Sequence, residues 1–448
     1  MDGTTLRDAF EAFVSRARID ELARELRVVE RVRKFDVPAL VWALVVGAGS
    51  DDSGQMADAY SAYLAEAEHH VVRGSFYVWF TERLAMLMAG LTQDGMNRVL
   101  ACPPILTGAL AGVLDWHVVD SETVTLRDEM GDVFPATSTS AGLKIHKRFS
   151  LGRNAMIGFE ITPARDHDAP LLRLDESWRG LGLIVDLGYA SHRLLRDCNR
   201  FGILLVLRLK AGWKPRLLRI FGDDGVPCEI AGEHALERLL DATQDDFLGC
   251  DVDYDVVFGS GANRVEARLV GLPADGSSEM HWCITTLPRA THTPALVGQL
   301  YRCRWEIECD NRRDKGGARL DQIRAWTLPS VMILVHASLL RTMMADHLTY
   351  LDLRDRPNTR APLHGLAVCL AMAVHAGALR LALTHDDPKR WERLARVIRS
   401  RGHDPNWRRR PSVLDCLRGT TAPPGRPRQT SMADSPLEAR PFRQSDAA

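Results

Sequence analysis

Residues 181–210 read LGLIVDLGYASHRLLRDCNRFGILLVLRLK, and this stretch indicates the fold class of the whole chain. It opens with a continuous apolar run that stops at Asp186, with Gly188 just beyond. That pattern is typical of a buried parallel strand that delivers a carboxylate at its carboxyl end. The stretch 191–202 then predicts a helix, and the apolar run at 203–210 predicts a second buried strand. The segment is therefore expected to form a strand–helix–strand unit.

Three further strand patterns precede this unit: LDWHVVDSETVTL (114–126), LKIHKRF (143–149) and AMIGFEIT (155–162). The first is rich in β-branched residues, and its short apolar run ends at Asp120. Three strands in a meander, then strand, helix and strand, are the order of a ribonuclease-H-like fold, in which the first and fourth strands lie side by side. We therefore expect an α+β or α/β protein with a mixed sheet and flanking helices, in which Asp120 and Asp186 face each other.

A charged segment, YRCRWEIECDNRRDK at 301–315, follows later in the chain. On a helix with 100° per residue, Arg304, Glu308 and Lys315 fall on one face close to Tyr301. A single carboxylate among several cations suits a metal-assisted reaction on a phosphodiester, because the acid can hold the cation and the basic side chains can hold phosphates. The same stripe also fits an ordinary solvated helix face with i,i+4 ion pairs.

The helix that carries this stripe is expected to begin at Pro294, because the missing N–H of proline would be unpaired at a helix start. Arg312 and Arg319 fall close to the same face. The glycine pair 316–317 directly follows Lys315 and is expected to end or kink the helix.

The spacing of Tyr, two residues, Arg, three residues, Glu, six residues and Lys resembles the signature of DDE transposases of the insertion-sequence-four type. The surroundings of Asp186, and over a shorter stretch those of Asp120, are similar to the surroundings of the first two catalytic acids in that family. The resemblance covers roughly residues 110–350. It implies that Asp120, Asp186 and Glu308 are the catalytic acids and the metal ligands.

Three other acids compete with Asp120 for the first position: Asp115, Glu122 and Asp128. Asp115 precedes the apolar stretch of the strand and Asp128 lies well past it, so Asp120 is preferred. Taken alone, Asp120 also fits an ordinary aspartate at a strand end or turn. An acid that closes a wholly apolar strand, as Asp186 does, needs a partner.

Three carboxylates that converge on one sheet edge offer hard oxygen ligands, which favour two Mg²⁺ ions, with Mn²⁺ as a substitute. Paired ions of this kind activate a water and stabilise the leaving 3′ oxygen, and the freed 3′-OH can then attack a target strand. Within the resemblance, the phosphates beside the scissile bond are bound by Tyr301, Arg304 and Lys315. The sequence has no glycine-rich loop ending in GK[ST], so no ATP is expected.

Residues 214–295 combine turn-forming residues with short strand patterns and predict a β-rich insertion subdomain, which the resembling family also has at this place. Trp282 lies in its last strand. In relatives, an aromatic residue of the insertion can receive a flipped base near the cleaved DNA end. For Trp282 a core position is the favoured interpretation, and Trp305, beside Arg304, leaves the same two possibilities open.

The remaining parts are expected to be helical. Residues 1–105 predict either a helical bundle with exposed arginines or, as the resemblance implies, a DNA-binding domain that recognises the element's ends. The catalytic core is expected over 106–213 and 296–350. The region 351–448 is expected to be helical at first and then to end in a basic, disordered tail, whose arginines at 408–410 either contact DNA or keep the tail soluble.

Composition sets the broad class. The 448 residues carry a net charge of −1, with 46% hydrophobic and 26% charged residues, as in soluble globular proteins of several domains. No overall basic field is present, so any DNA-binding surface must be local. The nine cysteines form no CxxC pair and predict reduced thiols in a cytosolic protein. Charged residues interrupt the apolar stretch 331–351, which predicts a core helix and no membrane span.

Together these features predict a DNA transposase that cuts the terminal inverted repeats of its own element and joins them to target DNA. We expect it to act as at least a dimer on double-stranded DNA and to be cytoplasmic and associated with the nucleoid. Two alternatives remain. One is a ribonuclease-H-like nuclease that cuts without joining. The other is a catalytically silent DNA-binding descendant of a transposase, against which the presence of all three acids argues.

Overall fold

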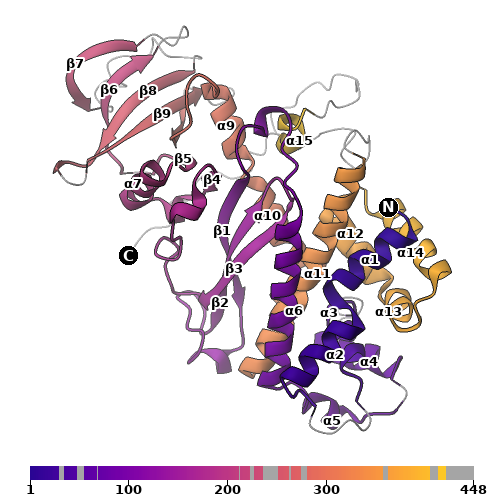
Figure 1. Cartoon of the computed structure of the whole chain (residues 1–448). Coiled ribbons are helices and arrows are strands. Elements are labelled where there is room, and N and C mark those ends of the chain that lie inside the picture. The colour runs from indigo at the N-terminus through magenta and orange to yellow at the C-terminus, as the bar shows by residue number, and fades with distance from the viewer. Residues whose placement is uncertain are drawn as a thin grey trace, which may run out of the picture.

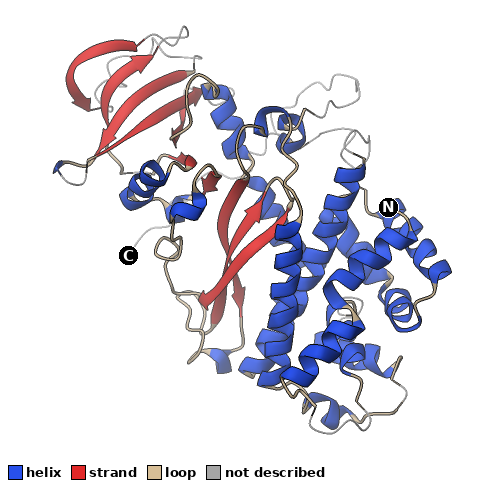
Figure 2. Ribbon diagram, viewed as in Figure 1, coloured by secondary structure: helices blue, strands red, loops and turns tan. Residues whose placement is uncertain are grey.

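The computed structural model describes residues 1–29, 35–47, 55–67, 69–210, 212–221, 227–235, 251–261, 264–273, 280–356, 362–403 and 412–419. Most helices gather on one side of a mixed sheet, and the strands farthest from them project away from the helical part (Figures 1 and 2). The predicted arginine cluster at 408–410 and the predicted disordered tail lie outside the described residues.

The first five strands are β1 (Trp116–Thr125), β2 (Gly142–Ser150), β3 (Ala155–Pro163), β4 (Gly182–Val185) and β5 (Leu204–Arg208). Their order in the sheet is β3-β2-β1-β4-β5. The pairs β3–β2 and β2–β1 are antiparallel, whereas β1–β4 and β4–β5 are parallel. The predicted ribonuclease-H-like arrangement, with first and fourth strands as neighbours, is confirmed.

Local sequence explains the strand–helix–strand unit. All four residues of β4 are buried, as its apolar run predicts. Helix α7 (His192–Phe201) begins at Ser191, whose side chain accepts a hydrogen bond from the Leu194 N–H. It ends at Gly202, where φ is +67°, a left-handed conformation that suits glycine because it has no Cβ.

The inserted segment continues the same sheet. Its strands are β6 (Arg216–Phe221), β7 (Pro227–Ala235), β8 (Val252–Phe258), β9 (Val265–Pro273) and β10 (Met280–Thr285). Strand β10 pairs antiparallel with β5, so that within the described residues a ten-stranded sheet runs on in the order β5-β10-β9-β8-β6-β7. The β-rich character expected for this segment is thus observed, with its strands hydrogen-bonded to the core sheet. Its standing as a separate subdomain stays a prediction.

The amino-terminal helices are α1 (Gly3–Val14), α2 (Arg16–Glu25), α3 (Val37–Val45), α4 (Gln55–Leu64), α5 (Arg73–Tyr77) and α6 (Glu82–Ala101). The later helices are α11 (Leu328–Asp355), α12 (Gly365–Val374), α13 (Ala376–His385), α14 (Pro388–Arg401) and α15 (Val413–Leu417). Helix α6 packs along α11, both contact β3, and α1 packs against α14 (Figure 1). One apolar cluster runs through α1–α6 and α11–α14 and onto β2 and β3, so helices from both ends of the described chain, α1 and α14, share a core.

Helix α11 is long and apolar enough to cross a membrane, and the pair α12 and α13 passes the same test although it is bent by 76°. However, 83% of the most apolar window of α11 is buried inside the protein. Burial of this extent is what a core helix shows, and it agrees with the interpretation of residues 331–351 from the sequence.

The prediction of one helix from Pro294 past Glu308 is wrong. Helix α9 (Pro294–Arg302) ends at Cys303, α10 (Trp305–Arg312) starts anew, and a π-helical turn, η6 (Arg313–Gly317), follows. Helix α9 packs on β5, β9 and β10, whereas α10 packs on β1. The break between the two helices lies at Cys303, which is itself buried in an apolar cluster.

Candidate active site

Two of the predicted acids lie side by side on neighbouring parallel strands. Val119 of β1 pairs with Val185 of β4, and the next residues along the two strands are Asp120 and Asp186. Strand β4 ends at Val185, so Asp186 follows a strand end as predicted. Asp120 does not, because β1 runs on to Thr125 through its pairing with β2 alone. Asp120 thus lies inside the strand, as the pattern over 114–126 predicts, and Asp186 is the neighbour expected for it.

The third acid joins the other two through an arginine. The guanidinium of Arg304, at the break between α9 and α10, contacts Glu308 with 2.6 Å between Nη2 and Oε1. Its Nε lies 3.8 Å from Asp186 Oδ1, and its Nη1 lies 3.9 Å from Asp120 Oδ2. Carboxylates from β1, from the end of β4 and from α10 thus converge on one cation.

Like charges crowd this point. Burial raises the pKa of Asp120 to about 6, and the negative charges of Asp186 and Glu308 add to the shift. The Ser121 backbone N–H, which donates to Asp120 Oδ1 at 2.8 Å, and the Arg304 guanidinium act in the opposite direction. Three acids against one arginine favour any additional cation.

The donor chemistry fits a hard divalent cation, since all three side chains offer carboxylate oxygens. In the described part of the chain, no three His, Cys, Asp or Glu side chains stand close enough together to hold one metal ion. At the acid centre, the Arg304 guanidinium is the positive group among the three acids. Joint metal binding would require Arg304 to move away and the carboxylates to approach each other.

The other two residues of the predicted signature, Tyr301 and Lys315, have different surroundings. The Tyr301 ring is half-buried, and burial raises the pKa of its hydroxyl to about 12, although Arg304 opposes the shift. The hydroxyl therefore stays protonated at neutral pH and can donate a hydrogen bond. Lys315 lies in η6 with 39% of its side chain exposed, and its Nζ is 3.8 Å from Glu122 Oε2.

The other two arginines of the predicted stripe point elsewhere. The Arg312 guanidinium covers the Trp305 ring, 4.3 Å from its centroid. Arg319 has a left-handed backbone, and its Nη1 lies 2.8 Å from Asp58 Oδ2 in α4. The prediction that these two arginines join the basic stripe is therefore wrong, since Arg312 faces Trp305 and Arg319 faces Asp58.

The two tryptophans differ in their surroundings. Trp282 is half-buried in β10, stacks with Tyr254 at a centroid separation of 6.0 Å, and faces Gly271 across the strand pair. A Cβ at Gly271 would come within 2.6 Å of the Trp282 ring, so that glycine makes room for it. Trp305 is 38% exposed, with Arg312 over its ring. A DNA contact for either residue stays a prediction.

The acids that compete with Asp120 are placed otherwise. Asp115 is buried at the start of β1, where it accepts hydrogen bonds from Ser150 Oγ at 2.6 Å and from two backbone N–H groups, and it pairs with Arg153. Asp128 is exposed in a short 3₁₀ turn. Glu122 lies two residues beyond Asp120, but its carboxylate contacts Lys147.

Analysis of the sequence missed this lysine and the charges around it. Lys147 of β2 contacts Glu122, Asp310 and Asp314, and Arg313 contacts Asp310 and Asp346. None of these six side chains is more than 4% exposed. We call this group, formed by Glu122, Lys147, Asp310, Arg313, Asp314 and Asp346, the acid-rich network. A signal was present in the sequence, because Lys147 lies in the strand predicted to pair with that of Asp120.

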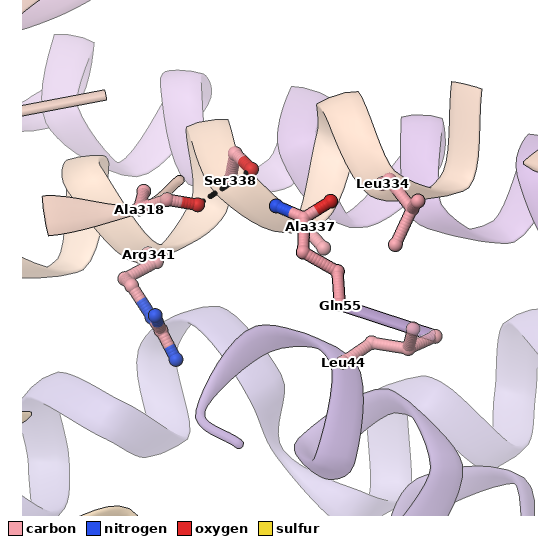
Figure 3. A pocket seen from close by; sticks show the side chains of 7 residues that line it. All are labelled: Leu44, Gln55, Ala318, Leu334, Ala337, Ser338 and Arg341. Carbon is pink, nitrogen blue, oxygen red and sulfur yellow. Dashed lines mark hydrogen bonds between the residues drawn. The ribbon is translucent and has the colours of Figure 1, made fainter. Parts of the chain in front are cut away.

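The chain after Lys315 is held by side chains from two helices. Arg341 Nη1 donates to the Gly317 carbonyl at 3.5 Å, and Ser338 Oγ donates to the Ala318 carbonyl at 3.0 Å. Gln55 Nε2 of α4 donates to the Arg319 carbonyl at 2.7 Å. Figure 3 shows these side chains around a narrow pocket between α11 and the α3–α4 region. We call the three contacts the carbonyl clamp.

Comparisons with known proteins bear on this arrangement. The family described as "Transposase DDE domain" matches residues 115–343, just over half of the chain. No curated protein matches it. Among solved structures, the chain is similar to the piggyBac transposase in its synaptic complex with hairpin DNA, at 11% identity and a TM-score of 0.46. That match covers 88% of this chain and 85% of the other.

Proposed function

This chain belongs to the family of transposase DDE domain proteins, and from that premise we propose that it cleaves the ends of its own insertion element and joins them to target DNA. The catalytic residues of this proposal are Asp120, Asp186 and Glu308. The observation that carries it is their convergence on the Arg304 guanidinium from three separate elements. The matched segment, 115–343, contains all of these residues.

The cofactor of this proposal is a pair of Mg²⁺ ions, for which Mn²⁺ can substitute, held by the three carboxylates. Bound there, the ions would supply an activated water and charge stabilisation for the leaving 3′ oxygen. The pKa of Asp120, about 6, leaves this carboxyl mostly ionised at neutral pH and so able to bind a cation.

The basic and aromatic residues of the centre hold the DNA. With the acids holding a divalent cation, Arg304 would be free to bind a backbone phosphate beside the scissile bond. Lys315 is exposed enough to bind a neighbouring phosphate, and the Tyr301 hydroxyl donates at the same end. The freed 3′-OH then attacks a target strand in a second phosphoryl transfer, which needs no covalent intermediate with the protein and no ATP.

The remaining parts of the proposal concern DNA and assembly. The amino-terminal helices would recognise the terminal inverted repeats, and Trp282 or Trp305 would contact the DNA end. Two copies of the chain would hold the two ends together in a homodimer. A protein of this kind acts on the chromosome in the cytoplasm.

A strand-joining reaction tests the proposal. The full chain is mixed with labelled DNA from the flanks of its own coding region, which is expected to carry inverted repeats, and with a target plasmid and Mg²⁺. The expected result is covalent transfer of the label to the plasmid. Cleavage without transfer would identify a nuclease, and binding without cleavage would identify a silent descendant.

Asp186→Asn is the decisive variant, because it removes one charge from the acid centre and keeps the side-chain shape. We expect it to abolish cleavage and to leave binding of the end DNA nearly unchanged. Asp197→Asn is the matched control, since Asp197 lies in α7 and pairs with Arg193 at 3.4 Å. Cleavage that persists in Asp186→Asn would refute the assignment of the acids.

A further inference from the structure

Lys147 lies at the centre of the acid-rich network. It stands directly across the β1–β2 pair from Asp120, and its side chain is almost wholly buried. Its ammonium contacts the carboxylates of Glu122 and Asp314, and it reaches Asp310 Oδ2 at 3.2 Å and Asn311 Oδ1 at 3.0 Å. One Nζ atom therefore has partners on three different elements.

Each of these elements carries a residue of the candidate active site. Glu122 is two residues beyond Asp120 on β1 and points to the same face of the strand. Asp310 and Asn311 follow Glu308 within one turn of α10. Asp314 directly precedes Lys315 in η6. The ammonium thus joins the strand of the first acid, the helix of the third acid and the turn of the basic residue.

A second cation extends the contact to the helical layer. Arg313 Nη2 lies 3.0 Å from Asp310 Oδ1, and its Nε lies 3.0 Å from Asp346 Oδ1 in α11. Packing is tight here, because a Cβ on Gly365 of α12 would lie 2.6 Å from Arg313 Cδ. Helix α10 is therefore held from the sheet side by Lys147 and from the α11 side by Arg313.

Stability alone explains this arrangement poorly. Taking charges out of water is costly, and apolar side chains of the same volume often serve a core as well or better. A buried ammonium with four oxygen partners fixes the positions of those partners relative to one another, because each must lie at hydrogen-bond distance from the same atom.

We propose that Lys147 is a positioning residue that fixes Glu308 relative to Asp120 by anchoring α10 to β1. The proposal rests on the proposed function, since it gives these two acids a joint task. It concerns this chain's own residues, and it does not require Lys147 to touch DNA or metal.

The test compares three variants of the full chain. Lys147→Met removes the ammonium and keeps most of the side-chain volume. This change leaves buried acids without a cation and can prevent folding. The double variant Lys147→Met/Asp314→Asn therefore removes one carboxylate charge as well. Arg268→Met is the matched control, since Arg268 of β9 is a buried cation paired at 2.6 Å with Asp253 in the inserted part of the sheet.

The first measurement is amide hydrogen exchange, which needs neither metal nor DNA. In the double variant we expect faster exchange across 305–312, with little change across 294–302, because only α10 has lost its anchor to β1. In Arg268→Met we expect both segments to exchange as in the wild type. Unchanged exchange across 305–312 in a folded double variant would overturn the proposal.

The second measurement is Mn²⁺ binding to the DNA-free protein by titration calorimetry. Loss of a residue that orients metal ligands lowers affinity by about tenfold or more. We expect the Mn²⁺ affinity of the double variant to fall by this factor even if the variant unfolds at the same midpoint as the wild type. A double variant with wild-type stability and wild-type Mn²⁺ affinity would show that Lys147 has a structural role only.

The two proposals fail in different ways. If the wild type binds Mn²⁺ no better than Asp186→Asn, the metal assignment of the proposed function is wrong. The exchange experiment still decides in that case whether Lys147 anchors α10.

Discussion

Two groups of buried charges lie against the same sheet, and they differ in the ratio of acids to cations. The acid-rich network sets two cations, Lys147 and Arg313, against four carboxyl groups, all of them almost wholly buried. On the inserted strands, Arg268 and Arg289 face Asp253 and Asp255 in a chain of contacts between 2.6 and 3.0 Å. Arg289 and Asp255 there remain about one quarter exposed. We call this second group the arginine–aspartate network.

The difference separates two uses of buried charge. In the arginine–aspartate network each carboxylate has a planar guanidinium partner, and water reaches part of it, so pairing can repay much of the cost of burial. The acid-rich network has more acids than cations and little access to water. Such a group is stable only where the surrounding fold keeps its members in place. Its contacts in turn fix α10 against β1.

Loss of the central cation gives the largest expected contrast. Lys147→Met leaves several buried carboxyl groups without their cation, and we expect it to lower the free energy of unfolding by about 3–5 kcal/mol. Arg268→Met should cost less, about 1–3 kcal/mol, because Arg289 Nε still lies 3.0 Å from Asp253. Urea unfolding of both variants measures the difference, and equal losses would contradict the contrast drawn here.

The second contrast is pH dependence. Burial raises the pKa of Glu122 to about 8, and the charge of Asp314 adds to the shift while Lys147 opposes it. Between pH 4.5, the ordinary value, and pH 8, the folded protein thus keeps a proton that the unfolded chain has released. This contribution to stability is complete below pH 4.5 and is lost as the pH rises to 8, at about 1.4 kcal/mol per pKa unit.

Glu122→Gln keeps the neutral form at every pH, so we expect a flatter fall in the unfolding midpoint between pH 5 and 8. Thermal unfolding at several pH values measures it. Arg268→Met serves as the control and should keep the slope of the wild type. An unchanged slope in Glu122→Gln would mean that Glu122 is ionised in the folded protein.

Overpacking gives a smaller contrast. In Gly365→Ala the new methyl group would lie 2.6 Å from Arg313 Cδ and 2.9 Å from Asp346 Oδ1, both held in place inside the acid-rich network. We expect a loss of about 1–3 kcal/mol in unfolding free energy. Gly271→Ala meets Trp282 and Val252 at 2.6 Å and Met280 at 2.9 Å. Trp282 and Met280 are half-buried and can shift, so its loss should be smaller. The reverse ranking would show that the acid-rich network is the more pliable of the two.

The smallest effect is expected at the rim of the arginine–aspartate network. Arg219 Nη1 lies 3.5 Å from Asp255 Oδ2, and more than half of the arginine side chain is exposed. Arg219→Ala should change stability by no more than about 0.5 kcal/mol, and added salt should reduce even that. A loss comparable with that of Arg268→Met would mean that this pair is better shielded from water than its exposure indicates.

The core strands were predictable because their signals are local. The apolar run before Asp186 ends where β4 ends, and the order of strands and helix is enough to make β1 and β4 neighbours. The strand pattern over 114–126 contains Asp120, and the order of the strands predicts Asp186 as its neighbour. Beyond Asp120 strand β1 pairs with β2 alone, and nothing in the sequence indicates where its pairing with β4 ends.

Features that depend on distant segments were not predictable. No helix-breaking residue stands at Cys303 or Arg304, and the break there follows from α9 and α10 packing on different strands. The sequence likewise holds no sign that β10 pairs with β5, whose residues lie 75 to 79 positions earlier, to extend the core sheet. The acid-rich network draws on β1, β2, α10, η6 and α11, and a single sequence reveals no such meeting of segments.

The carbonyl clamp bears on how this protein can be recombined with its relatives. Gln55 and Asp58 of α4 grip Arg319 through its carbonyl and its guanidinium, only four residues after Lys315. The amino-terminal helical bundle therefore cannot be exchanged freely for the bundle of a relative. A chimera with a foreign bundle would need side chains equivalent to Gln55 and Asp58 at the same positions. Without them, the turn that follows Lys315 would lose its contacts with α4.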